Sequence, residues 1–181
     1  MQDEERLLIE NKVTINAEQK IRNKAYLKYE LSTKAQQQPN SNFFLVPREW
    51  LYFKSRDTSK AINRLVARRM AESPVIFDED KMEYSAKRME VFMKERGYYN
   101  AEVETSTKIL PDNKRVQVMY DIFPNQQYFI DTITYFSKDS TIQKLLNETS
   151  DERFLKQGVP GSIELYNKEV KRIVDFLRDQ G

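Results

Sequence analysis

The sequence predicts an α+β protein made of two tandem β-α-α-β-β units, the second of them incomplete. An amphipathic helix closed by glycine, residues 87–97, recurs 84 positions later as residues 171–181, with four of eleven positions identical. After the first glycine the apolar period changes from 3.6 to 2, as it does where a helix gives way to strands. Two unrelated helices with a common pattern are the alternative, but a strand and a helix precede both copies and favour a repeat.

The composition fits a soluble protein with small cores. Hydrophobic residues make up 39 % of the 181 residues, below the usual level of about 45–50 %. The net charge of +2 is nearly balanced and gives no general argument for nucleic acid. The absence of cysteine and histidine excludes disulfides, thiol nucleophiles, Cys/His zinc sites and imidazole catalysis.

Targeting signals are not evident. No apolar run approaches the roughly 18 residues that span a bilayer. The first six residues lack the basic start and apolar stretch of a signal peptide. If the protein is exported, we expect its signal to lie outside this sequence.

The first unit begins with a strand at residues 7–16 and a helix at 17–38. A break at 36–42 precedes an aromatic segment at 43–53, whose secondary structure is ambiguous. Its aromatic residues are expected to lie in the core, although an exposed docking patch is the alternative. They are Phe43, Phe44, Trp50, Tyr52 and Phe53.

A helix at residues 58–71 carries a basic stripe at helical spacing. The stripe consists of Lys60, Arg64, Arg68 and Arg69. We expect a solvated face, with contact to anionic lipid headgroups or an acidic partner as the functional alternative. The next helix opens on Asp78, Glu79 and Asp80, which favour the positive end of the helix dipole rather than a metal site.

A β-hairpin follows Gly97. One face of its first strand is formed by alternate residues: Ala101, Val103, Thr105, Thr107 and Ile109. Residues 111–113 form the turn, and residues 116–122 alternate again, so one face of the hairpin is buried. Residues 124–127 then mark the domain boundary.

The second unit repeats the order of elements with fewer parts. A strand at residues 128–136, a short helix at 140–147, a loop at 158–161 and a helix at 162–180 are expected. The predicted domains are therefore residues 1–124, with a long insertion at about 36–73, and residues 125–181, truncated before a hairpin. One strand cannot form its own sheet, so autonomous folding of the second unit is in doubt.

The stretch Gly97-Tyr98-Tyr99-Asn100-Ala101-Glu102-Val103 resembles the POTRA (polypeptide-transport-associated) domain at the point where its second helix meets the hairpin. The Tyr-x-Ile at Tyr128–Ile130 resembles the start of the next POTRA unit. The Gln-Pro-Asn segment within residues 36–40 is similar to the expanded first unit of TamA-like or BamA-like outer-membrane assembly proteins, a variant associated with Bacteroidetes. The usual Glu-Gly before the tyrosine is replaced by Pro-Asn-Gln, and no membrane barrel is present.

The resemblance implies a three-stranded mixed sheet packed on two helices, with the third strand central. The second strand, residues 101–109, would then be an edge at which client strands dock by β-augmentation. A simpler interpretation of the charged residues on this strand is that they prevent the exposed edge from aggregating. Gly97, Tyr98 and Tyr99 would pack where helix meets sheet, and the units would hinge near residues 124–127.

By the same resemblance, the chain is a non-enzymatic periplasmic module without a cofactor, attached to the outer membrane through parts outside this sequence. Its partners would be unfolded outer-membrane proteins or accessory assembly subunits, and a membrane barrel in the same full-length chain. Two rival functions remain: a nucleic-acid binder using the basic stripe, for which binding would depend steeply on salt, and a purely structural spacer.

Overall fold

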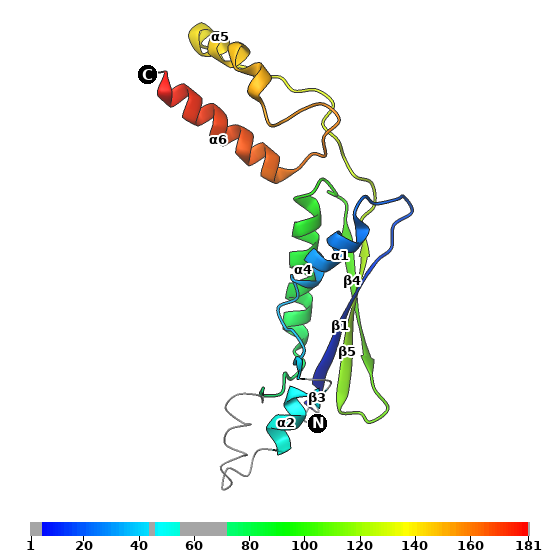
Figure 1. Ribbon diagram of the computed structural model, residues 1–181. Coiled ribbons are helices and arrows are strands. Elements are labelled where there is room, and N and C mark those ends of the chain that lie inside the picture. The colour runs from blue at the N-terminus through cyan, green and yellow to red at the C-terminus, as the bar shows by residue number, and fades with distance from the viewer. Residues whose placement is uncertain (1–4, 44–45, 55–71, 181) are drawn as a thin grey trace. The chain divides into compact units, whose positions relative to one another are not determined.

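The computed structural model describes residues 5–43, 46–54 and 72–180, which form two compact units (Figure 1). The first unit contains residues 1–16, 20–89 and 103–122. The second contains residues 17–19, 90–102 and 123–181, so it includes the end of one helix and the turn after it. The domain limits expected from the sequence, 1–124 and 125–181, stay a prediction.

A three-stranded mixed sheet forms the first unit. Its strands are β1 (Leu7–Ile15), β4 (Glu102–Ile109) and β5 (Arg115–Phe123), in the spatial order β1-β5-β4. Strand β1 runs parallel to β5, with a register shift between Leu8 and Glu10. Strands β4 and β5 are consecutive and form the predicted hairpin. The predicted α+β class and the central place of the third strand are confirmed.

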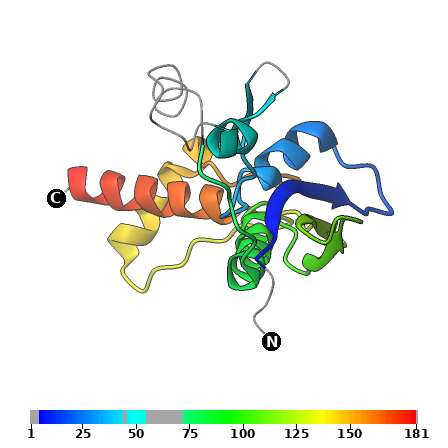
Figure 2. The same ribbon diagram turned by 90° about the horizontal axis from the view of Figure 1, so that it is seen from below.

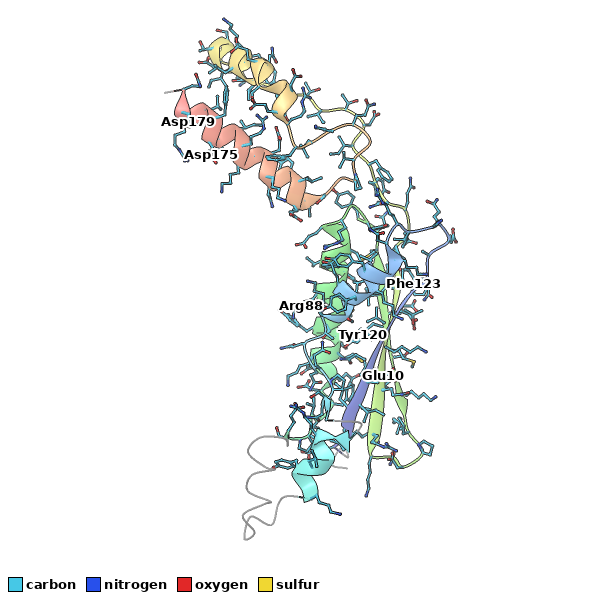
Figure 3. All side chains as sticks on the ribbon, in the orientation of Figure 1. Glu10, Arg88, Tyr120, Phe123, Asp175 and Asp179 are labelled. Carbon is cyan, nitrogen blue, oxygen red and sulfur yellow. The ribbon has the colours of Figure 1, made fainter. Side chains whose placement is uncertain are left out.

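The core lies on one face of this sheet. Strand β5 alternates strictly, and its inward side chains are all at most 2 % exposed: Val116, Val118, Tyr120 and Ile122. Helices α1 (Lys24–Ser32) and α4 (Glu79–Lys94) cover this face (Figures 1 and 2). Tyr120 points toward them (Figure 3), and burial raises the pKa of its hydroxyl. The period of two thus decides which face is buried.

The helix predicted at residues 17–38 is shorter in the structure, where α1 covers only Lys24–Ser32. Asn23, directly before it, has a left-handed backbone with φ 56°. Beyond the helix, Gln37 leaves the helical path because its side-chain amide donates to the carbonyl of Ile76 (2.7 Å) and accepts from the N–H of Asp78 (3.0 Å). Tertiary hydrogen bonds therefore outweigh helix propensity at this end.

The insertion contains short elements where it is described. Strands β2 (Asn42–Phe43) and β3 (Val46–Pro47) pair antiparallel, and helix α2 (Arg48–Lys54) follows. Tyr52 is 40 % exposed, so it is not a core residue. The helix predicted at 58–71, with Lys60, Arg64, Arg68 and Arg69, lies outside the described residues.

The second unit contains helices α5 (Ser140–Glu148) and α6 (Ile163–Asp179), with the short 3-10 helix η1 (Ser150–Glu152) between them. Helices α5 and α6 lie side by side in both views (Figures 1 and 2). Asp139 caps α5 by accepting from the N–H groups of Thr141 (2.8 Å) and Ile142 (3.1 Å).

The strand predicted at residues 128–136 is wrong. Only Phe129 forms a β-bridge there, with Pro160, and Ile130 donates its N–H to the carbonyl of Val159 (2.8 Å). Residues 131–136 belong to no strand. A strand is stabilised by the ladder to its neighbour, and the second unit offers this segment no partner of strand length.

Within the described ranges, no helix is long and apolar enough to cross a membrane. Across these same residues, no group of three or more carboxylates is placed to hold a metal ion. Asp78 instead accepts from the N–H of Lys81 (3.2 Å) and pairs with its ammonium group (2.9 Å). Both bonds lower the pKa of Asp78.

Candidate protein-docking site

Strand β4 is an edge of the sheet, with β5 on one side only among the described strands. The face formed by its alternate residues becomes more exposed along the strand. Val103 and Thr105 are half-buried, whereas Thr107 and Ile109 are exposed, Ile109 by 46 %. The other face is exposed along the strand. An edge of this kind presents main-chain donors and acceptors to a partner strand.

The opposite edge of the sheet is partly covered. Leu8 of β1 donates its N–H to the carbonyl of Val75 (2.9 Å), and Phe77 donates to the carbonyl of Arg6 (2.8 Å). The side chain of Asn11 donates to the carbonyl of Gln37 (2.6 Å) further along β1. The first half of β1 is therefore bonded on its outer side, which leaves β4 as the better candidate for docking.

Gly97 ends the turn after α4 in a left-handed conformation, with φ 86°. Its carbonyl accepts from the N–H of Tyr128 at 2.9 Å. A side-chain carbon at position 97 would lie 3.0 Å from the carbonyl oxygen of Tyr128 and 3.3 Å from the nitrogen of Gly161. Glycine is thus required here both by its backbone angle and by close packing.

Three aromatic and polar contacts brace this turn. The ring centroids of Tyr99 and Tyr128 are 5.7 Å apart, in a tilted arrangement. The Tyr99 hydroxyl donates to the carbonyl of Gly161. Asn100 donates to the Tyr128 hydroxyl at 3.0 Å. Tyr99 therefore holds the loop at residues 158–161. The sequence predicted that Tyr99 packs where the helix meets the sheet, but it did not indicate this contact with the loop.

The segment expected to act as a hinge is bonded to the same turn. Asn125 donates to the carbonyl of Asn100 (2.7 Å), and Gln127 donates to the carbonyl of Arg96 (3.0 Å). Pro124 is fully buried. These contacts lie within the second unit, and the hinge expected near residues 124–127 stays a prediction.

Tyr98 and Ala101 are buried in the turn, at 7 % and 4 % exposure. Burial raises the pKa of Tyr98. Ala101 precedes β4, and its N–H donates to the carbonyl of Tyr98 at 3.1 Å. Of the predicted docking residues, Ala101 thus has a main-chain donor that is already used within the turn.

Sequence reasoning missed the residues that receive the Gly97 turn. Tyr128 and Gly161 provide the carbonyls and ring against which it packs, and the side chain of Asn125 donates to the carbonyl of Asn100 in the same turn. Asn125 has a positive φ of 56°, and the sequence could have indicated this turn because asparagine tolerates the left-handed region. No pattern in the sequence indicates the contact of Tyr99 with Gly161, which is 62 residues away.

Comparison with known proteins assigns the family. Residues 11–125, more than half of the chain, match the POTRA family, which carries the description "Surface antigen variable number repeat". The chain belongs to the POTRA family. The resemblance found in the sequence is thereby confirmed, whereas the association with Bacteroidetes stays a prediction.

The match covers the sheet of this POTRA protein from within β1 to just past β5, together with α1 and α4. The candidate edge strand and the Gly97 turn both lie inside the matched residues. Helices α5 and α6 lie beyond them.

A solved structure is also similar, "Crystal structure of Haemophilus Influenzae BamA POTRA3-5". It is 12 % identical, and the likeness covers 98 % of this chain and 87 % of that one with a TM-score of 0.33. These values are too low to add to the argument, so the assignment depends on the family match. No curated protein matches the chain.

Proposed function

We propose that this POTRA chain is a periplasmic protein-interaction module of an outer-membrane protein assembly or translocation factor. It docks extended client strands or accessory subunits along β4 by β-augmentation. The observation that carries the proposal is the position of β4 at the sheet edge, inside the residues that match the POTRA family. The proposed partners are unfolded outer-membrane proteins, accessory assembly subunits and a membrane barrel in the same full-length chain.

The hairpin indicates which main-chain groups a client would meet. The N–H of Leu110 donates to the carbonyl of Arg115 at 2.9 Å. In an antiparallel pair, residues bonded to the neighbour alternate with residues whose main-chain groups point away. Counting back from Leu110 in steps of two places the bonded residues at Lys108, Ser106 and Glu104.

The residues between these positions turn their N–H and C=O groups to the open side. They are Thr105, Thr107 and Ile109. Val103 follows in the same series but already takes part in another interaction. A strand that adds to the sheet would therefore bond to the later part of β4, where the side chains are also exposed.

Proline at position 105 tests this proposal. Thr105→Pro removes an outward N–H but no bond to β5, and edge strands tolerate proline. We expect the variant to remain folded by circular dichroism and to bind a strand peptide from a β-barrel outer-membrane protein at least tenfold more weakly, measured by isothermal titration calorimetry.

Thr105→Val is the matched control, because it keeps the N–H and the β-branched shape. Its affinity should stay within twofold of the parent chain. Equal affinity of the proline variant, the valine variant and the parent would show that the peptide does not pair with β4, and the proposal would then be wrong.

A further inference from the structure

The segment that leads into α1 and forms its first half, residues 20–29, contains four cations and no carboxylate. The cations are Lys20, Arg22, Lys24 and Lys28. Over the whole chain, 30 basic residues are almost balanced by 28 acidic ones. The ten residues 20–29 therefore form a local concentration of positive charge in a chain that has little net charge.

The four cations are exposed. Within the described part of the chain, none of them forms an ion pair. Other lysines of the chain do, such as Lys81 with Asp78 at 2.9 Å and Lys168 with Glu164 at 2.7 Å. The described residues thus leave the positive charge of this segment facing solvent.

Two tyrosines lie among these cations and point away from the core. Tyr26 and Tyr29 are 62 % and 67 % exposed, whereas Leu27 and Leu31 on the other face of α1 are 7 % and 0 % exposed. The leucines pack α1 onto the sheet (Figures 1 and 2). Rings exposed to this extent contribute little to the core, so packing does not explain why both positions are aromatic.

The cations do not stabilise the helix either. Lys24 is the first residue of α1, and the first turn contains no acidic residue. Positive charge at this end opposes the helix dipole, whose amino end is itself positive. Basic residues kept where they cost helix stability are typical of a functional surface rather than of a purely structural one.

We propose that this α1 surface, residues 20–29, binds a bilayer surface that contains anionic phospholipid. Each lysine or arginine near such a surface strengthens binding about fivefold, and tyrosine rings are enriched at the level of the lipid headgroups. A bilayer needs no groove, so the convex face of a helix can lie on it. The net charge of +2 favours a membrane over nucleic acid, whose binding domains are strongly basic.

The inference goes beyond strand docking at β4, since it concerns another part of the first unit and another class of partner. Vesicle co-sedimentation of the 181-residue chain tests it. Vesicles of three parts phosphatidylcholine and one part phosphatidylglycerol should bind the chain at least tenfold more strongly than vesicles of phosphatidylcholine alone. Added salt should weaken this binding.

The double variant Lys24→Gln, Lys28→Gln should bind the phosphatidylglycerol vesicles at least tenfold more weakly. Both side chains are exposed, so the variant should stay folded by circular dichroism. The matched control is Lys12→Gln, Lys108→Gln, which removes the same charge from exposed positions on the opposite face of the sheet. Its vesicle affinity should change by less than twofold, because salt screens charges that lie far from the bilayer.

The tyrosines are tested separately. Tyr26→Ser, Tyr29→Ser keeps every charge and should weaken vesicle binding at least threefold. Bicelles of the same lipid composition with a spin label on the headgroup should broaden the amide NMR signals of Tyr26 and Tyr29 but not those of Lys12 and Lys108.

The other outcomes overturn the proposal. Equal binding to both kinds of vesicle would show that anionic lipid is not recognised. Equal losses in the two lysine variants would indicate general attraction to charge, and undiminished binding of the Lys24, Lys28 variant would place the contact elsewhere in the chain. Tighter binding to a DNA duplex than to the vesicles, lost in the same variant, would assign the α1 surface to nucleic acid.

Discussion

Gly97 and Tyr128 exchange a close main-chain contact that no other residue at position 97 can make without strain. The N–H of Tyr128 donates to the carbonyl of Gly97 at 2.9 Å. The carbonyl oxygen of Tyr128 lies 3.0 Å from where a side-chain carbon on Gly97 would be. The turn that leads into the candidate docking strand is thus fixed by backbone atoms.

Replacement of Gly97 by alanine should lower the free energy of unfolding by about 3 kcal/mol, measured by urea denaturation. A left-handed conformation costs an L-residue about 1–2 kcal/mol, and displacement of the Tyr128 carbonyl adds to this. The matched control is Gly158→Ala. Gly158 also has a positive φ, 78°, but an added carbon there meets nothing within 4 Å.

Gly158→Ala should lower the free energy of unfolding by only about 1 kcal/mol, which is the cost of the left-handed backbone alone. The difference between the two variants measures the contact with Tyr128. Equal losses for both variants would mean that the packing around Gly97 contributes nothing.

Glu169→Gln should destabilise the second unit by about 3 kcal/mol, the typical cost of removing one partner of a buried ion pair. The substitution leaves the guanidinium of Arg172, which also donates to the Thr149 hydroxyl at 2.5 Å, without its counter-charge. Denaturation followed by the NMR signals of α6 would measure the loss.

The double variant Glu169→Leu, Arg172→Met should recover only the part of the loss that comes from the unpaired guanidinium. Leucine at position 169 still leaves the Tyr135 hydroxyl and the Phe154 N–H without their acceptor. Glu169→Leu and Arg172→Met made singly complete the cycle. A double variant whose loss of stability equals the sum of the two single losses would indicate that the two residues act independently.

Glu72 should make the insertion acid-sensitive. Its carboxylate accepts from the Ser41 N–H (3.1 Å) and hydroxyl (2.9 Å) and from Arg48 (2.6 Å), and these bonds lower its pKa to about 2. Because the pKa of Glu72 is lower in the folded chain than its ordinary value of 4.5, its ionised carboxylate stabilises the fold at pH values above 4.5. This stabilisation is lost as the pH falls from 4.5 toward 2.

The chemical shift of the Ser41 amide reports Glu72 in the folded chain and should therefore change only as the pH approaches about 2, and Glu72→Gln should remove this titration. Glu10→Gln is a suitable control, because Glu10 lies on β1 and makes no contact with Ser41 that the structure records. A Ser41 titration that persists in the Glu72 variant would assign it to another group.

Much of the first unit could be predicted from the sequence because its periodicity is strong. The alternation of β5 and the helical spacing of Met82, Ala86 and Met89 both report burial against the same core. The glycine that separates the two periods locates the boundary between helix and strand. These signals are local, and local patterns place elements well.

The sequence-based predictions failed where contacts between residues far apart in the sequence determine the structure. Gln37 leaves the predicted helix for hydrogen bonds to Ile76 and Asp78, 39 and 41 residues away. Tyr99 binds Gly161, which no pattern near either residue indicates. The strand expected at 128–136 failed because a strand needs a neighbour, and periodicity says nothing about whether one is present.

Amide hydrogen exchange along β4 tests the central claim most directly. Exchange is followed by NMR, with and without the strand peptide from a β-barrel outer-membrane protein. We predict that the peptide slows exchange at Thr105, Thr107 and Ile109, while Glu104, Ser106 and Lys108 are already protected by β5. Unchanged exchange at Thr105, Thr107 and Ile109 under saturating peptide would contradict docking at this edge.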